Sequence, residues 1–453
     1  NTSNPEQPLM DVVDPLPASF RTPRLSYSVF DAGRLWIGNS RFSRYDIQTS
    51  RNRMNCPWIR NERDAFVAPP QVSGNVVFHL RRREGSSAYT ASAINGDDGK
   101  AIWEIDLAVP LALVAVDMQK RQIHAINSQA ELFEITTADF GSGRLDRPAQ
   151  KVIGTSRSVP FDESIQLESS RWALASRQER HKVIVYDPGA STSSERLQAR
   201  VLASVGDAQV TALPTALQAG LLVPLDTGQV LLVDPKTGQD QVLPFQPRVE
   251  AGRKIQWRHP AVIDNGGSQF VITDDRKKVY RVGVQDTPQK HLVGLAETEL
   301  QQEIASELAV AGDTIYGVVH GASSDTVVSL AAEDLAIGKE WPVDGRVVWG
   351  PERVGQLVLL ATDGEQLLAY DRGQQQKWTA QLKHGPLAGT PLLQDGQLIL
   401  TSVNGTLWQL SAEDGTEGPV AEIGEPLGAG AVPFAGRLLL SGCDGTLLVV
   451  PAL

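Results

Sequence analysis

The sequence predicts an all-β fold, a closed β-propeller of four-stranded antiparallel blades, with eight to ten blades. Three observations predict it: a strand-and-turn unit that recurs about every 40 residues, glycine-containing tight turns at fixed places in that unit, and almost no helical periodicity. A repeat array also accounts for a chain of 453 residues, since each unit needs to pack only against its neighbours.

The turns are clearest near the C-terminus. Three Asp-Gly or Asn-Gly pairs each follow a β-rich run and precede another, namely Asp363-Gly364, Asn404-Gly405 and Asp444-Gly445. Such pairs favour two-residue hairpin turns in which both residues take positive φ. A second turn precedes each of these runs, at Val354-Gly355, Asp395-Gly396 and Ala435-Gly436.

The clearest complete unit covers residues 389–423, with strands expected at 391–393, 397–402, 406–411 and 420–423. Weaker copies cover most of the chain, and the last one, 430–453, stops after three strands. A propeller commonly closes by building one blade from both chain ends. We therefore expect a single domain over residues 1–453, with a strand at about 9–16 completing the last blade.

Two segments carry a more specific pattern. Residues 93–103 read Ala-Ile-Asn-Gly-Asp-Asp-Gly-Lys-Ala-Ile-Trp, and residues 232–238 read Leu-Val-Asp-Pro-Lys-Thr-Gly. They resemble the repeat of the pyrroloquinoline-quinone-like (quinoprotein-type) propeller family. That family includes quinone-dependent dehydrogenases and non-catalytic scaffolds. In character the chain is similar to the non-catalytic propeller lipoproteins that assist outer-membrane barrel assembly.

The repeat motif implies structural roles for its residues. Its Asp is expected to accept backbone hydrogen bonds within the turn, its Gly to take positive φ, and its Trp to pack between blades. These motif residues are Asp98, Gly99, Trp103, Asp234, Gly238, Asp371 and Trp378.

Composition excludes several classes. The formal net charge of -11 and a pI of about 5.2 disfavour nucleic-acid binding. No apolar stretch reaches the ~18 residues that a transmembrane helix needs. We expect a monomer with an unidentified protein partner. The resemblance implies a periplasmic or cell-envelope location, with any leader removed before residue 1.

The sequence shows no catalytic centre. The two cysteines, Cys56 and Cys443, are not adjacent, whereas quinone-dependent alcohol dehydrogenases use a disulfide of two adjacent cysteines. The seven histidines show no paired spacing of the kind that metal sites use. We therefore expect no catalytic residue, no cofactor and no metal. Residues from different blades could still converge on a central channel.

These observations favour a non-catalytic protein-binding scaffold. The candidate partner contacts are Trp36, Trp257 and Trp349, because tryptophan is common in binding hot spots. Packing in the core is the alternative role for all three. The alternative functions are a quinone-dependent dehydrogenase using pyrroloquinoline quinone and calcium, and a propeller that senses a small ligand in its channel.

Overall fold

A computed structural model gives the fold of the chain. It describes residues 11–12, 26–39, 41–61, 64–66, 68–83, 89–117, 120–136, 138–139, 148–152, 159–168, 170–248, 252–263 and 267–453. These residues form ten β-sheets, which we number in chain order. The helical elements among them are α1 (Ser193–Arg196), η1 (Thr49–Arg51) and η3 (Ala203–Val205). The all-β prediction is confirmed.

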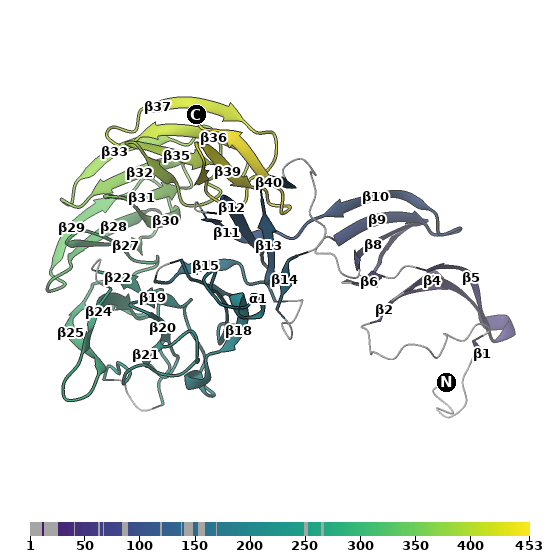
Figure 1. The fold of residues 1–453 in the computed structure, drawn as a ribbon, viewed down its shortest axis with the longest axis horizontal. Helices are drawn as coiled ribbons and strands as arrows, with labels where there is room; N and C mark the ends of the chain where they lie inside the picture. The colour runs from purple at the N-terminus through teal and green to yellow at the C-terminus, as the bar shows by residue number, and fades with distance from the viewer. Residues whose placement is uncertain are drawn as a thin grey trace. The chain divides into compact units, whose positions relative to one another are not determined.

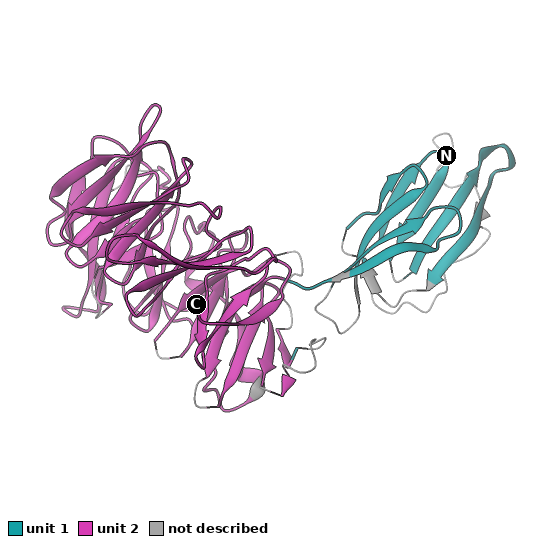
Figure 2. Cartoon of the chain, turned by 90° about the horizontal axis from the view of Figure 1, so that it is seen from above, with its two compact units in different colours: residues 1–109, 141–148 teal, residues 110–140, 149–453 magenta. Residues whose placement is uncertain are grey.

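The chain divides into two compact units, where the sequence led us to expect one domain. Unit 1 comprises Asn1–Val109 and Gly141–Pro148, and unit 2 comprises Pro110–Phe140 and Ala149–Leu453 (Figure 2). The expected N-terminal strand also differs. Within 9–16 only Asp11–Val12 are described, and they pair parallel to Arg53–Met54 in unit 1; the rest lies outside the described residues. Pairing within unit 1 closes a much shorter loop than pairing with the last sheet would.

Unit 1 contains sheets 1 and 2. Trp36 and Phe42 from sheet 1 and Phe66, Val77 and Ile94 from sheet 2 form the core between them. Sheet 1 has the order β1-β5-β4-β3-β2; in sheet 2 the order is β10-β9-β8-β6, and β7 also pairs with β8. The strands are β1 (Asp11–Val12), β2 (Tyr27–Asp31), β3 (Arg34–Gly38), β4 (Arg41–Gln48), β5 (Arg53–Asn61), β6 (Asp64–Phe66), β7 (Gln71–Ser73), β8 (Val76–Arg83), β9 (Tyr89–Asn95) and β10 (Ala101–Leu107).

Unit 2 begins with sheets 3 to 6, in which each strand pairs with the next along the chain. Sheet 5 has three strands, and bridges from Val230 to Phe245 and from Val233 to Asp240 extend its edge. The strands are β11 (Leu111–Asp117), β12 (Gln122–Asn127), β13 (Glu131–Ile135), β14 (Gln150–Lys151), β15 (Glu163–Gln166), β16 (Trp172–Ala175), β17 (Lys182–Tyr186), β18 (Leu197–Val201), β19 (Thr215–Leu217), β20 (Gly220–Pro224), β21 (Val230–Val233), β22 (Ala261–Val262), β23 (Gln269–Thr273), β24 (Lys278–Gln285) and β25 (His291–Glu299).

Sheets 7 to 10 complete unit 2 with the same antiparallel order. The strands are β26 (Ala309–Ala311), β27 (Thr314–His320), β28 (Asp325–Ala331), β29 (Ile337–Pro342), β30 (Val347–Val354), β31 (Leu357–Thr362), β32 (Gln366–Asp371), β33 (Gln376–Gln381), β34 (Leu392–Gln394), β35 (Gln397–Thr401), β36 (Thr406–Ser411), β37 (Glu417–Glu422), β38 (Val432–Phe434), β39 (Arg437–Ser441) and β40 (Leu447–Pro451). The inner strands are more deeply buried than the fourth ones: in sheet 8 β31 is buried throughout and β33 is mostly exposed, and in sheet 9 β35 is mostly buried and β37 mostly exposed.

The turn chemistry differs in part from the prediction. Asp395 and Gly396 have φ of 50° and 78°, as a two-residue turn with two left-handed residues requires. At Asn404-Gly405, however, only the glycine is left-handed, with φ 90°. The N–H of Gly405 donates to the carbonyl oxygen of Ser402 at 3.0 Å. This longer loop therefore needs one left-handed residue at its end, and not two at its centre.

Apolar cores join the sheets of unit 2 face to face. Seven clusters link sheet 3 to 4, 4 to 5, 5 to 6, 6 to 7, 7 to 8, 8 to 9 and 9 to 10. An eighth cluster packs Phe434 and Leu439 of sheet 10 against Ile123, Ala125 and Phe133 of sheet 3. Figure 1 accordingly shows β39 and β40 beside β11 and β12. This all-β series of packed antiparallel sheets is consistent with the β-propeller class.

Candidate functional site

A cavity in unit 2 collects charged and aromatic side chains from three sheets. It has a volume of about 520 Å³ and is lined by Glu163 of β15, Arg177 of the β16–β17 turn, Ala305, Ser306, Glu307, Val318 and His320 of β27, and residues 347–352 of β30. Among the described residues, the core clusters join sheet 4 to sheets 3 and 5 and not to sheets 7 or 8. The cavity therefore brings together residues that are distant both in sequence and in the order of core packing. We call it the inner cavity.

The irregular strand β30 shapes one wall of the inner cavity. Its pairing with β31 shifts register on both sides of Trp349. Gly350 has φ +81°, and a Cβ there would lie 2.5 Å from the carbonyl oxygen of Leu359. Pro351 follows and has no N–H to donate to β31. The sequence Trp-Gly-Pro thus produces a bulge, and Trp349 and Glu352 on either side of it line the cavity, beside Val348, which is 64% exposed.

Two of the carboxylates near the cavity are paired. The Nε–H of Arg177 donates to Glu163 Oε1 at 2.6 Å. Burial alone would lower the pKa of Arg177, but its hydrogen bond with Glu163 raises it. Asp325 accepts a hydrogen bond from the N–H of Val347 at 2.8 Å and lies 2.6 Å from Arg346 and 2.9 Å from His320 Nδ1. Burial would raise the pKa of Asp325, but these three partners lower it.

Two other carboxylates are not paired. Glu307 and Glu352 have no hydrogen-bond or ion-pair partner for their carboxylates among the described residues. Burial, and secondly the charge of Glu307, raises the pKa of Glu352 to about 6. With Glu163 and Asp325 neutralised by their cations, the inner cavity is left with a net negative charge.

The inner cavity does not fit the quinone cofactor that the repeat family suggests. Pyrroloquinoline quinone carries three carboxylates and needs cationic side chains around them. Here the cation Arg177 is already engaged by Glu163, and Glu307 and Glu352 would repel the ligand. Within the described part of the chain, no group of three or more His, Cys, Asp or Glu side chains could hold a metal ion.

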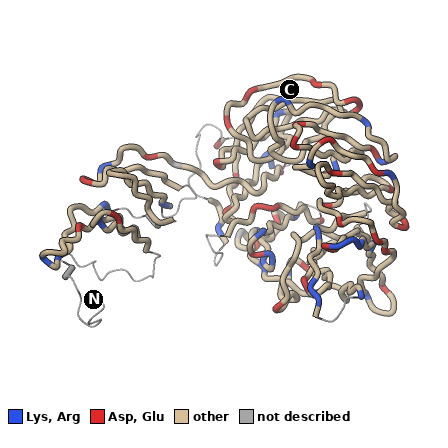
Figure 3. Tube along the Cα trace, turned by 180° about the vertical axis from the view of Figure 1, so that it is seen from behind, with Lys and Arg blue, Asp and Glu red and all other residues tan. Residues whose placement is uncertain are grey.

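A second cavity, of about 680 Å³, lies near the turns of sheets 5 and 6. It mixes basic and acidic residues, and Asp274 on its wall accepts hydrogen bonds from the backbone N–H groups of Arg276, Lys277 and Lys278. Its lining has five basic and four acidic side chains, so the cavity offers no preference for one ligand charge. Acidic and basic residues are likewise interspersed along both units (Figure 3).

The structure changes the set of candidate contact residues. Trp36 and Trp257 are each 1% exposed, which corrects their assignment as partner contacts. Trp36 belongs to the core of unit 1, and Trp257 packs edge-to-face on Tyr280 between sheets 5 and 6, with ring centroids 5.6 Å apart. The ring of Trp36 is buried because alternation along β3 points it at sheet 2, whereas Trp257 lies outside any strand, in the connection that precedes β22. Trp349 alone of the three lines a cavity.

Sequence reasoning missed the cavity residues Glu163, Arg177, Glu307 and Glu352. Each is a single charged residue in an otherwise ordinary repeat, and nothing in its neighbourhood distinguishes it. The one local signal was Gly350-Pro351, an unusual pair inside a strand.

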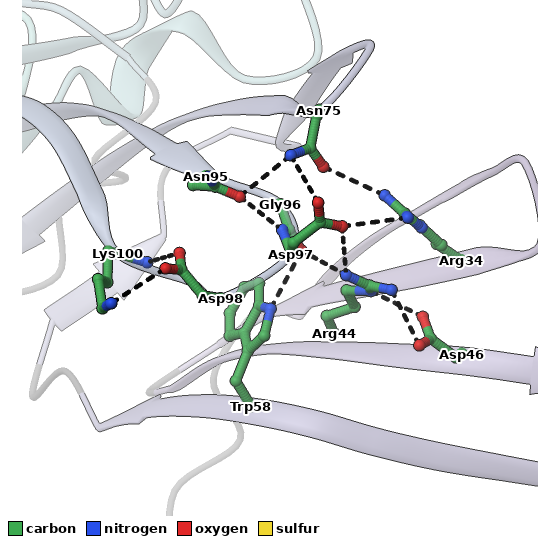
Figure 4. Close-up of polar contacts among 10 residues, drawn as sticks. All are labelled: Arg34, Arg44, Asp46, Trp58, Asn75, Asn95, Gly96, Asp97, Asp98 and Lys100. Atoms are coloured by element: carbon green, nitrogen blue, oxygen red, sulfur yellow. Dashed lines mark hydrogen bonds and ion pairs between the residues drawn. The ribbon is translucent and has the colours of Figure 1, made fainter.

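The repeat motif in sheet 2 forms a tight turn held onto sheet 1. Asp98 Oδ1 accepts the N–H of Lys100 at 3.0 Å (Figure 4). Gly99 between them has φ +70°. Arg44 donates to the carbonyl oxygen of Gly96 at 2.7 Å, and Trp58 Nε1–H donates to the same oxygen at 3.1 Å. The turn therefore serves as an anchor between neighbouring sheets.

The other motif residues vary in their geometry. Asp234 Oδ1 accepts the N–H of Lys236 at 2.8 Å, and Gly238 has φ +72°. Asp371 accepts from the N–H groups of Gly373 and Gln375, and the left-handed residue in this turn is Gln374, with φ 57°. Trp378 is buried between sheets 8 and 9.

Trp103 differs from the expected packing between blades. It is 46% exposed and contacts the ring of Phe78 at 6.4 Å. The reason is its place in β10, at the last sheet of unit 1, where no further described sheet of that unit covers this face.

Antiparallel sheets joined face to face, with glycine-containing turns and tryptophans between the sheets, are features expected of pyrroloquinoline-quinone-like repeats. Residues 328–418 match the family described as outer membrane protein assembly factor BamB. Over these residues the chain is similar to that family, in agreement with the resemblance that the repeat motif carries. In the described residues, no helix is both long and apolar enough to cross a bilayer.

Several solved structures show weak similarity, each with 10% sequence identity. BamB from Moraxella catarrhalis aligns with a TM-score of 0.41 over 86% of this chain and 100% of that chain. The designed protein Ika8 aligns with a TM-score of 0.38 over 86% of this chain and 96% of that chain. A chain of the mitotic checkpoint complex aligns with a TM-score of 0.41 over 64% of this chain and 88% of that chain. Similarities of this size support no conclusion about function. No curated protein matches the chain.

Proposed function

We propose that unit 2 is a closed eight-bladed propeller and that the chain is a non-catalytic protein-binding scaffold of the cell envelope. The observation that carries the proposal is the cyclic order of the eight core clusters, in which sheet 10 packs on sheet 3. The inner cavity supports it too, since an array that curves back on itself brings sheet 4 near sheets 7 and 8.

A closed ring suits a scaffold because each sheet is held in place by two neighbouring sheets. The turns and the ends of the channel are then available to bind a partner. The poor fit of the inner cavity to a quinone argues against the dehydrogenase alternative. The envelope location is supported by the match of residues 328–418 to the outer membrane assembly factor.

The proposed contact surface is the pair Val348 and Trp349 on β30. Val348 is 64% exposed and apolar, and Trp349 is half-buried beside it at the inner cavity. An exposed apolar residue next to an anchored tryptophan is the arrangement found at binding hot spots.

The test places a photo-crosslinking amino acid at Val348 in the full chain and, as a matched control, at Leu243, which is 53% exposed and bridges to His291 of β25. We expect one defined protein adduct from Val348 in envelope extract, absent from Leu243 and lost in Trp349→Ala. Equal adducts from both positions would contradict the contact site. Dye reduction on adding pyrroloquinoline quinone and calcium would overturn the non-catalytic assignment.

A further inference from the structure

We propose that the inner cavity binds a guanidinium or ammonium group carried on an apolar stem. The inference deepens the proposed function, since it names the chemistry that a partner would present at Val348 and Trp349. It concerns the cavity alone, so a free ligand can test it without any partner protein.

Charge is the first argument. The cations at or beside the cavity are already neutralised: Arg177 pairs with Glu163, and Arg346 pairs with Asp325 at 2.6 Å. His320 lies 2.9 Å from the same aspartate. Glu307 and Glu352 remain unpaired among the described residues. Glu307 is exposed and Glu352 is half-buried. The two carboxylates repel each other, and an incoming cation relieves this repulsion and the partial desolvation of Glu352.

The apolar wall is the second argument. Trp349, Val318 and Val347 line the same cavity as Glu352. A tryptophan ring attracts a cation over its face, and valine side chains favour a methylene stem. The volume of about 520 Å³ lies within the range of small-molecule sites. A cavity lined by both carboxylates and apolar side chains fits an amphipathic cation.

Other ligand classes fit less well. An anion would meet Glu307 and Glu352 with no free cation to bind it. A bare metal ion would need a third ligand, and the described residues contain no group of three potential metal ligands. A neutral apolar ligand would leave the two carboxylates desolvated and unpaired.

The cation has two conceivable sources, which share one chemistry. It is either a small free amine or guanidine, or an Arg or Lys side chain of a partner protein. Agmatine, an alkyl guanidine, probes the first source, and the blocked tripeptide Gly-Arg-Gly probes the second. The same tripeptide with citrulline in place of arginine is a neutral control of nearly the same shape.

The experiment titrates these three probes into the full chain by calorimetry, with tryptophan fluorescence as a second readout. We expect agmatine and the arginine tripeptide to bind and the citrulline tripeptide not to bind. Glu352→Gln should weaken binding about tenfold, the loss expected for one charge-assisted contact, and Glu307→Gln similarly. Glu413→Gln, whose side chain is 85% exposed on an outer turn, should have no effect.

Binding should also depend on pH. Glu352 must be ionised to pair with the cation, and its pKa is raised to about 6, so binding should be about fivefold weaker at pH 5 than at pH 7.5. The groups that face it are Glu163, Arg177, Glu307 and His320. Glu352→Gln should therefore reduce the pH dependence of binding, because the variant side chain carries no titratable carboxyl.

The outcomes test the cation-binding inference separately from the proposed scaffold function. Binding of agmatine alone assigns a small-molecule ligand, and tighter binding of the arginine tripeptide assigns a partner side chain; either supports the inference. Equal binding of the citrulline tripeptide, no binding of any probe, or unchanged affinity in both glutamine variants overturns it. A partner adduct at Val348 with no cation binding would leave the scaffold standing and remove only the cation chemistry.

Discussion

The indole ring of Trp378 in β33 lies against Gly415, which belongs to a turn of the next sheet. Its Nε1–H donates to the carbonyl oxygen of Ala412 at 3.2 Å, and a Cβ on Gly415 would come within 2.8 Å of the ring. Trp58 and Gly99 repeat this relationship in unit 1, where the indole donates to the oxygen of Gly96. In both cases the acceptor lies three residues before the glycine. The Trp and Gly of the motif thus work as a pair across two sheets.

Gly415→Ala should destabilise unit 2 through this contact. The alanine would carry a left-handed backbone at φ +73° and would also press on Trp378. Gly396→Ala is the matched control: it has φ +78° but nothing within 4 Å of the added Cβ. We expect about 1 kcal/mol of lost stability in the control and about 1–3 kcal/mol more in Gly415→Ala, measured by thermal unfolding followed by circular dichroism. Equal losses would show that the backbone alone requires glycine.

Arg44→Ala should loosen the anchor between sheets 1 and 2. The guanidinium of Arg44 is 8% exposed and bridges Asp46, Asp97 and the carbonyl oxygen of Gly96. Removing it should cost about 1–3 kcal/mol and raise protease cleavage at residues 95–100. The exposed Arg51 provides the control variant, Arg51→Ala. Unchanged cleavage in Arg44→Ala would mean that Trp58 and Arg34 hold the turn without it.

His79 should make unit 1 sensitive to acid. Burial, followed by the charges of Arg81 and Arg60, lowers its pKa to about 3, and its ring packs 4.7 Å from Phe42 and 5.3 Å from Phe66. The unfolded chain binds this proton below about pH 6.5, whereas the folded chain binds it only near pH 3. The contribution of neutral His79 to the free energy of unfolding is therefore complete above pH 6.5 and falls by up to about 1.4 kcal/mol per pH unit toward pH 3.

His79→Phe should remove this dependence, since phenylalanine cannot be protonated. Hydrogen exchange of peptides covering β8, labelled at pH 5 and pH 7 and corrected for intrinsic rates, measures it. His181→Phe, at an exposed histidine, is the control and should leave the pH dependence of β8 intact. The same acid sensitivity in His79→Phe would assign it to another group.

Glu352 should act on stability in the opposite sense. Its pKa is raised to about 6 from 4.5, so the folded chain holds a proton that the unfolded chain has lost between those values. The contribution of Glu352 to the free energy of unfolding is therefore greatest below pH 4.5 and falls as the pH rises to about 6, by about 1–2 kcal/mol in total. Glu352→Gln should match the parent at pH 4.5 and exceed its stability at pH 7.5 in urea unfolding. Lower stability of the variant at pH 7.5 would indicate a hidden partner of the carboxylate.

Strand positions and turns could be predicted because their signals are local. In sheet 9 the predicted strands 397–402 and 406–411 correspond to β35 (Gln397–Thr401) and β36 (Thr406–Ser411). The turn type at Asn404 was mispredicted, since the dipeptide alone does not give the loop length. The burial of Trp257 and the exposure of Trp103 were also out of reach, because both depend on whether another sheet covers the residue.

The sequence by itself determined the all-β class, the repeat and the residues that make each turn, because alternation and left-handed glycines act over a few neighbouring residues. Only the tertiary structure decided that the chain splits into two units and that Glu163, Glu307 and Glu352 share one cavity with Trp349. These residues come from different repeats, and the packing of whole sheets, which no local pattern encodes, brings them together.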